Sequence, residues 1–237
     1  MKASTRLEAK QAFVLDQEDF IKLCKILGQI TPVIETKILC SDGLTRIPER
    51  IEEVVAYENS RRSSIVSIEI HGSAEDRGAS SDLVIGGQHS NSISLSLRGE
   101  EQEALKVRME VADFLDGLRP WYSRIAIFDM FLFWAPVLII LLFSSKMMLP
   151  ENQNPVPMTW KQTGVSVLVV IAVMILLFYA VSGVAKLKKA CFPVSTFAMG
   201  QGLKRHQLLE NIRWTIVVGF LVSITGSCVF ALQPWLR

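Results

Sequence analysis

Three histidines, His71, His89 and His206, are the side chains of this 237-residue chain best suited to act as acids or bases at neutral pH. They fall on a predicted strand, in a predicted loop and beside an apolar run, and none has a nucleophile or a metal ligand at motif spacing. The glycine-containing stretches at residues 77–81 and 86–87 do not match a phosphate-binding loop. The sequence therefore predicts neither an enzyme nor a cofactor site.

The four cysteines are too dispersed to form a disulfide framework or a metal site. Three of them, Cys24, Cys40 and Cys191, are predicted to be cytosolic, where thiols stay reduced. The fourth, Cys228, lies inside an apolar run. We therefore expect no metal ion and no disulfide.

Three apolar runs, at about residues 125–145, 164–185 and 214–232, are each close to the ~20 residues that cross a hydrocarbon core. A chain of this size could not enclose three helices that are apolar on every face. Tryptophan rings favour the headgroup level, and four tryptophans lie at the ends of these runs: Trp121, Trp160, Trp214 and Trp235. Residues 121–237 are therefore predicted to form an all-α bundle of three transmembrane helices.

Charge is divided unevenly between the two halves of the chain. Residues 1–120 hold twenty acids and fifteen bases, whereas residues 121–237 hold three acids and ten bases. The net charge of +2 hides this division, so the chain does not have the basic surface of a nucleic-acid-binding protein. We expect no nucleic-acid partner, and the lipid bilayer is the expected neighbour of the basic half.

The segment at residues 186–213 is rich in basic residues: Lys186, Lys188, Lys189, Lys204, Arg205 and Arg213. The loop at residues 146–163 has only two, so the positive-inside rule places the N-terminal half and the basic segment in the cytosol and the C-terminus outside. No cleavable signal is predicted, because the first ten residues are polar. This plan is typical of bacterial inner-membrane proteins, and we expect that location.

Three roles are open for the six basic residues of this segment. They could only set the topology, bind anionic lipid at about 1 kcal/mol each near the surface, or dock against the acidic N-terminal domain. Residues 203–213 also have helical periodicity. That periodicity fits either a helix lying on the membrane or a downward extension of the third transmembrane helix.

Asp129 is the one acid inside an apolar run, where an ionised group is costly unless it is paired or wet. It is a candidate counter-ion or gating residue facing Arg213 or Lys186; alternatively it lies at the interface and pairs with Arg124. Pro136, in the middle of the same run, is predicted to kink the helix.

Small residues recur every fourth position in the third apolar run, at Gly219, Ser223 and Ser227. They form a smooth stripe that another helix can approach closely, either in a homo-oligomer or within one protomer's own bundle. The second run is nearly all aliphatic, which argues against a pore within a single protomer, because a permeation path needs polar lining or several copies.

Residues 1–120 are predicted to form a cytosolic α+β domain. Asp16 caps an amphipathic helix that ends at Gly28, and a second, longer helix starts at Glu100. Four strands are expected between the helices, at residues 33–39, 64–71, 83–85 and 92–98, together with a short helix near residue 51. Alternation of apolar and polar residues in two of the strands favours an antiparallel sheet with helices on one face.

Pro120 ends the last helix of the domain about four residues before the first apolar run. A rearrangement in the domain would therefore be felt by the membrane helices. We expect a membrane-anchored binding, sensor or adaptor module whose domain recognises a cytosolic protein partner or ligand. The alternative is a homo-oligomeric pore or membrane-perturbing effector.

Overall fold

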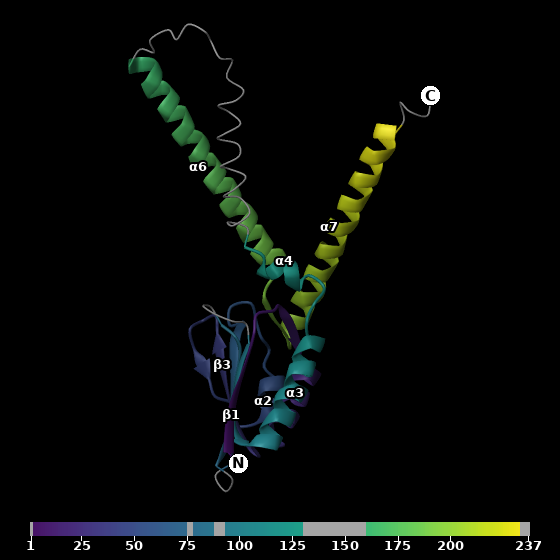
Figure 1. The fold of residues 1–237 in the computed structure, drawn as a ribbon. Helices are drawn as coiled ribbons and strands as arrows, with labels where there is room; N and C mark the ends of the chain where they lie inside the picture. The colour runs from purple at the N-terminus through teal and green to yellow at the C-terminus, as the bar shows by residue number, and fades with distance from the viewer. Residues whose placement is uncertain (1, 75–77, 88–92, 130–159, 233–237) are drawn as a thin grey trace. The chain divides into compact units, whose positions relative to one another are not determined.

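The computed structural model describes residues 2–74, 78–87, 93–129 and 160–232 (Figure 1). Most of the first predicted transmembrane segment, including Pro136, lies outside the described residues, as does His89. The chain divides into two compact units, residues 1–127 with 191–237 and residues 128–190. The basic segment that follows the second predicted transmembrane helix therefore folds mainly with the N-terminal residues.

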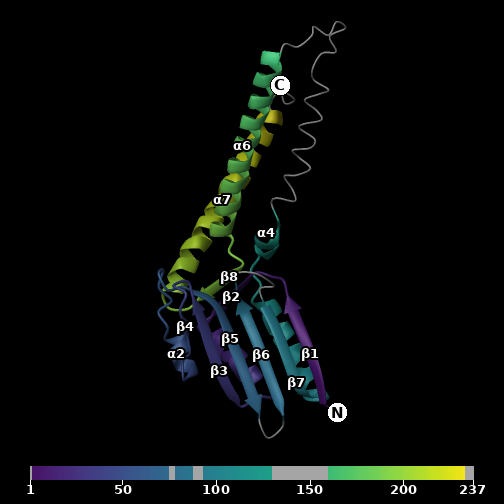
Figure 2. The ribbon, with the colours of Figure 1, turned by 90° about the vertical axis from the view of Figure 1, so that its left-hand side faces the viewer.

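A six-stranded antiparallel sheet forms the centre of the first unit, in the order β1-β7-β6-β5-β3-β4 (Figure 2). The strands are β1 (Lys2–Ala9), β3 (Val33–Cys40), β4 (Thr45–Arg46), β5 (Ile65–Ala74), β6 (Ala79–Gly86) and β7 (Ile93–Glu100). The predicted α+β fold with an antiparallel sheet is confirmed, and the sheet is larger than the four strands expected.

The sequence analysis did not predict β1, because its residues alternate between charged and small side chains and carry little apolar signal. It pairs with β7 along its whole length, from Lys2 opposite Glu100 to Ala9 opposite Ile93. The residues of β1 have only a weak intrinsic preference for a strand. Their backbone hydrogen bonds to β7 are what make the segment a strand.

Helices cover one face of the sheet and bury the apolar side chains of its strands (Figures 1 and 2). Asp16 caps α1 (Gln17–Leu27) as predicted, because its carboxylate accepts a hydrogen bond of 2.8 Å from the amide of Asp19. The other two are α2 (Ile51–Val55) and α3 (Glu101–Gly117). In α3, Leu115 is buried in the core, whereas the neighbouring Phe114 is only partly buried.

The opposite face of the sheet is polar and open. A row of cross-strand neighbours runs over it, and it consists of Glu35, His71, Asp82, Ser96 and Arg6. The imidazole of His71 lies 2.7 Å from the carboxylate of Asp82. Short alternation of apolar and polar residues therefore identified the two faces correctly.

A second, two-stranded sheet joins distant parts of the chain. β2 (Phe13–Asp16) pairs in parallel with β8 (Ser195–Ala198), and the rings of Phe13 and Phe197 meet edge to face at 5.6 Å. Phe197 and Met199 belong to the same hydrophobic core as the large sheet. The basic segment thus supplies part of the core of the domain.

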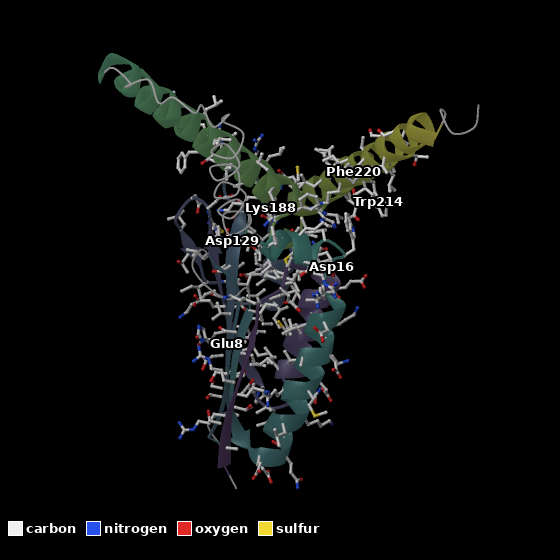
Figure 3. The ribbon with its side chains drawn as sticks, turned by 45° about the horizontal axis from the view of Figure 1, so that its top comes forward. Glu8, Asp16, Asp129, Lys188, Trp214 and Phe220 are labelled. Atoms are coloured by element: carbon white, nitrogen blue, oxygen red, sulfur yellow. The ribbon has the colours of Figure 1, made fainter. Side chains whose placement is uncertain are left out.

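Two helices of 32 residues flank β8, namely α6 (Trp160–Cys191) and α7 (Gln201–Leu232). Among the described residues, only the part of α7 at residues 201–227 is long and apolar enough to cross a membrane. From Trp214 to Ser227 its side chains are exposed or only partly covered (Figure 3). An apolar helix exposed on all sides is characteristic of a membrane span. The three-helix bundle remains a prediction.

One prediction tests the packing of the large sheet. A Cβ atom on Gly72 would lie 2.2 Å from the hydroxyl oxygens of both Thr31 and Ser81. These two buried hydroxyls form a hydrogen bond of 2.8 Å with each other. We expect Gly72→Ala to destabilise the domain by about 1–3 kcal/mol through overpacking. Amide exchange of β5 and β6 in the detergent-solubilised full chain measures this. Gly117→Ala, with nothing within 4 Å, is the control, and equal stability of the two variants would contradict the prediction.

Candidate coupling site at the start of helix α7

The loop at residues 57–59 holds the first turn of α7 against the domain. The amide of Gln201 donates a hydrogen bond of 2.7 Å to the carbonyl of Glu58. Gly200 has a φ of +50° and lies so close to this loop that a Cβ atom on it would be 2.5 Å from the same carbonyl. Gly202 is buried nearby. Glycine is required here by both the backbone conformation and the space.

Asn59 is the centre of this contact. It is buried and has φ of +47°, a conformation in which asparagine is enriched. Its amide nitrogen donates to the carbonyl of Phe197 at 2.8 Å, and its side-chain oxygen accepts from the amide of Ile65 at 2.9 Å. The guanidinium of Arg205 donates to its backbone carbonyl at 2.6 Å. We call Asn59, Gly200, Gly202 and Arg205 the clamp.

Two turns further along α7, Arg213 is fully buried. Its guanidinium stacks on the ring of Tyr122 at 4.0 Å and its Nε donates to the carbonyl of Cys191 at 2.6 Å. Glu210 is the nearest carboxylate, at 3.9 Å. Arg213 therefore connects three chain segments. They are α7, the end of α6, and the residues that follow α3 and precede the short helix α4, which spans Ser123–Ile127.

Several aromatic rings cluster around Tyr122, on which this arginine stacks. Trp121 lies 5.8 Å from both Tyr122 and Trp214, and Phe192 lies 5.8 Å from Tyr122, measured between ring centroids. Ring pairs at this separation add about 0.5–1.5 kcal/mol each beyond the burial of their area. The cluster fixes the start of the apolar part of α7 next to the chain that leaves α3.

A cavity of about 310 Å³ lies between the start of α1, the end of α3 and the second turn of α7. Its charged and aromatic lining residues are Asp16, Asp19, Arg119, Trp121, Tyr122, His206 and Glu210. The imidazole of His206 lies 3.3 Å from the carboxylate of Glu210. The lining has an excess of carboxylates over cations, so it favours positively charged groups over anions.

Burial sets the protonation of several groups near the site. Desolvation raises the pKa of Tyr122, which the nearby charge of Arg213 partly opposes, so the phenol stays protonated at neutral pH. Desolvation also raises the pKa of Asp19, and the charge of Asp16 adds to that effect. The pKa of the Cys24 thiol is raised to about 12 by burial, so it is unreactive. In the part of the chain that the structure describes, no three His, Cys, Asp or Glu side chains are grouped to hold a metal ion.

Several other predicted site residues are not part of the clamp. Asp129 lies near Lys188, which also donates a hydrogen bond to the carbonyl of Phe128 (Figure 3). The pairing of Asp129 with Arg213, Lys186 or Arg124 stays a prediction. The remaining lysines of the basic segment, Lys186, Lys189 and Lys204, are exposed.

The small-residue stripe of α7 is not covered by any described residue. The hydroxyl of Ser223 donates to the carbonyl of Gly219, and that of Ser227 donates to the carbonyl of Ser223, both at 2.8 Å. A Cβ atom on Gly219 would have nothing within 4 Å. The hydroxyls are therefore satisfied within the helix, and the stripe stays smooth.

Arg213 yields a second prediction. Because its two terminal nitrogens are buried without hydrogen-bond partners among the described residues, we expect Arg213→Met to stabilise the junction by about 1–4 kcal/mol. Arg213→Ala should destabilise it, because it leaves a cavity. Thermal unfolding of the detergent-solubilised full chain compares the two. A methionine variant that melts as low as the alanine variant would contradict this expectation.

Sequence reasoning assigned Arg205 and Arg213 to the basic segment but missed Asn59, Gly200 and Gly202. Two glycines at the start of a helix, one directly before α7 and one at its second residue, are a signal that could have pointed to a close backbone approach. No family model matches the chain, and comparison with curated proteins and with solved structures gives no significant similarity.

Proposed function

We propose that the chain is a membrane-anchored binding module, in which the α+β domain recognises a cytosolic partner and passes that event to three transmembrane helices. The domain and the basic segment lie in the cytosol, the C-terminus lies outside, and the membrane is a bacterial inner membrane. The distribution of Lys and Arg supports this orientation.

The observation that carries the proposal is the continuity of α7. Its first turn is held by Asn59 and Arg205 of the clamp, and its exposed apolar part begins at Trp214 without a break in the helix. A helix is stiff along its axis, so a displacement of the loop at residues 57–59 moves the apolar part as well. This arrangement suits transmission better than a flexible tether.

The open face of the large sheet is the surface best suited to the partner. It lies opposite the helices, is polar, and carries both signs of charge, as in Glu35, Lys37 and Arg6. A surface with charges of both signs binds selectively, and at a high association rate, to a protein whose surface carries the complementary charges. A protein partner is therefore favoured over a small apolar ligand.

Site-specific photo-crosslinking in the native membrane tests this function. A photoreactive amino acid at Glu35 or Ser96 of the open face should give one adduct of the same partner from both positions. Met109, exposed on the outer side of α3, is the control position and should give none. Absence of an adduct from the sheet, or an equal adduct from Met109, would remove the proposal. The chain should also stay in the membrane fraction after alkaline extraction.

A homo-oligomeric pore is the second candidate, and the uncovered stripe at Gly219, Ser223 and Ser227 favours it. Copies that associate through the stripe would bring several Asp129 side chains into one assembly. Light scattering of the purified protein in nanodiscs, corrected for lipid, separates the candidates. A defined ring of four or more copies supports the pore, and a monomer removes it for the resting state.

A further inference from the structure

Four polar groups that can donate hydrogen bonds are buried together without partners among the described residues. They are both terminal nitrogens of Arg213, the hydroxyl of Tyr122 and the hydroxyl of Thr196. Tyr122 stacks on Arg213, and its hydroxyl lies close to both Thr196 and Arg213. A guanidinium with two hydroxyl groups beside it offers several hydrogen-bond donors, and such a group is chemically suited to bind an oxyanion.

We call the arrangement in which Arg213 stacks on Tyr122 the docked state. In this state few favourable contacts offset the cost of burying the guanidinium. Burial of a guanidinium costs several kcal/mol, even after relaxation. Against this cost stand one hydrogen bond to Cys191, a stacking contact of about 2 kcal/mol and the more distant charge of Glu210. Glu210, at 3.9 Å, is too far for a hydrogen bond. A small competing interaction can therefore draw Arg213 out of the docked state.

The position of Arg213 along α7 indicates where such a competitor is found. The next residue is Trp214, which packs against Trp121, and the exposed apolar part of the helix begins there. Paired tryptophans at the start of an apolar span mark the headgroup level of a bilayer, where lipid phosphates lie.

We propose that Arg213 is a lipid-phosphate switch, in which the phosphate oxyanion of an anionic lipid binds the guanidinium and draws it away from Tyr122 and Cys191. Guanidinium and phosphate pair in a bidentate manner, which satisfies the two terminal nitrogens that the docked state leaves without partners. The inference rests on the proposed function, because it names the class of lipid that regulates the contact between the domain and the membrane helices.

Release of Arg213 loosens the contact between its three chain segments. The end of α6 loses a hydrogen bond at Cys191, and the chain that follows α3 loses the stack on Tyr122. The clamp at Asn59 does not involve Arg213 and stays closed. Anionic lipid thus changes the path between domain and membrane without unfolding the domain.

Amide exchange of the full chain in nanodiscs tests this inference. The lipids are phosphatidylcholine alone, phosphatidylcholine with phosphatidylglycerol, and phosphatidylcholine alone with added inorganic phosphate. We expect residues 120–127 and 191–194 to exchange about tenfold faster in the anionic lipid, as for the loss of one hydrogen bond to a charged group. Residues 57–65 should not change.

Variants decide whether Arg213 is responsible. Arg213→Gln should abolish the lipid response, whereas Arg124→Gln, at an exposed arginine nearby, should keep it. Tyr122→Phe removes an unpartnered hydroxyl but keeps the stack, so it should weaken the response and serves if Arg213→Gln does not fold. A response that persists in Arg213→Gln, or is lost equally in Arg124→Gln, overturns the inference.

The same experiment separates the two sources of phosphate and the two proposals. An equal response to inorganic phosphate in phosphatidylcholine overturns the assignment to lipid. If the wild-type chain does not respond to anionic lipid at all, the switch is wrong, although photo-crosslinking from the open sheet face can still identify a partner. Conversely, a lipid response without any crosslinked partner removes only the proposed function.

Discussion

Replacing Gly200 by alanine is expected to detach the start of α7 from the sheet domain. The new Cβ atom would lie 2.5 Å from the carbonyl oxygen of Glu58 and 2.8 Å from that of Tyr57, both of them backbone atoms that cannot rotate away. The φ of +50° adds a steric cost for any residue with a Cβ atom. Together these effects should cost about 2–5 kcal/mol. Amide exchange at residues 201–205 and 57–65 of the full chain in detergent measures the loss.

Gly219→Ala, within α7, is the control, because its Cβ atom has no neighbour within 4 Å. It should leave exchange at residues 201–205 unchanged and slightly favour the helix. If the two alanine variants behave alike, the close approach at Gly200 does not hold α7 in place.

Asn59→Ala should have a comparably large effect for a different reason. It leaves the carbonyl of Phe197 and the amide of Ile65 buried without their partners, at about 1–3 kcal/mol each. The positive φ adds to this, because alanine tolerates that conformation less well than asparagine. We expect a total loss of about 3–5 kcal/mol, measured as the shift in the denaturation midpoint of the detergent-solubilised chain.

Asn59→Gly separates the two causes. Glycine adopts the positive φ freely but also lacks the side-chain hydrogen bonds. Its stability should therefore fall between those of the wild type and the alanine variant. Stability equal to the wild type would show that the side-chain hydrogen bonds contribute nothing, which would contradict our assignment of Asn59 as the centre of the clamp.

Local patterns in the sequence predicted the elements whose signal is contained in a few neighbouring residues. Asp16 and the apolar positions that follow it specify α1 because cap and periodicity occur within three turns. Alternation around Ile68 and Ile70 specifies β5 and its buried face for the same reason. The antiparallel sheet follows from such strands.

Contacts between distant residues were beyond this reasoning. The pairing of β2 with β8 depends on backbone hydrogen bonds that no single segment encodes. Asn59 and Gly200 also look like ordinary loop residues until the chain brings them together. The extension of α7 below the apolar run was one of two predicted alternatives, and only its packing against β8 and the clamp decides between them.

The pairing of β2 with β8 also sets the order of events during synthesis. Phe13 pairs with Ser195, about 180 residues later, so at roughly 5–20 residues per second the ribosome needs about 10–40 s to supply the second strand. During that time the core contributed by Phe197 and Met199 is missing, although all six strands of the large sheet have already been translated. The domain is therefore finished only after the whole of α6 has been translated. A chain that stops within α6 would therefore lack β8 and the part of the core that Phe197 and Met199 supply.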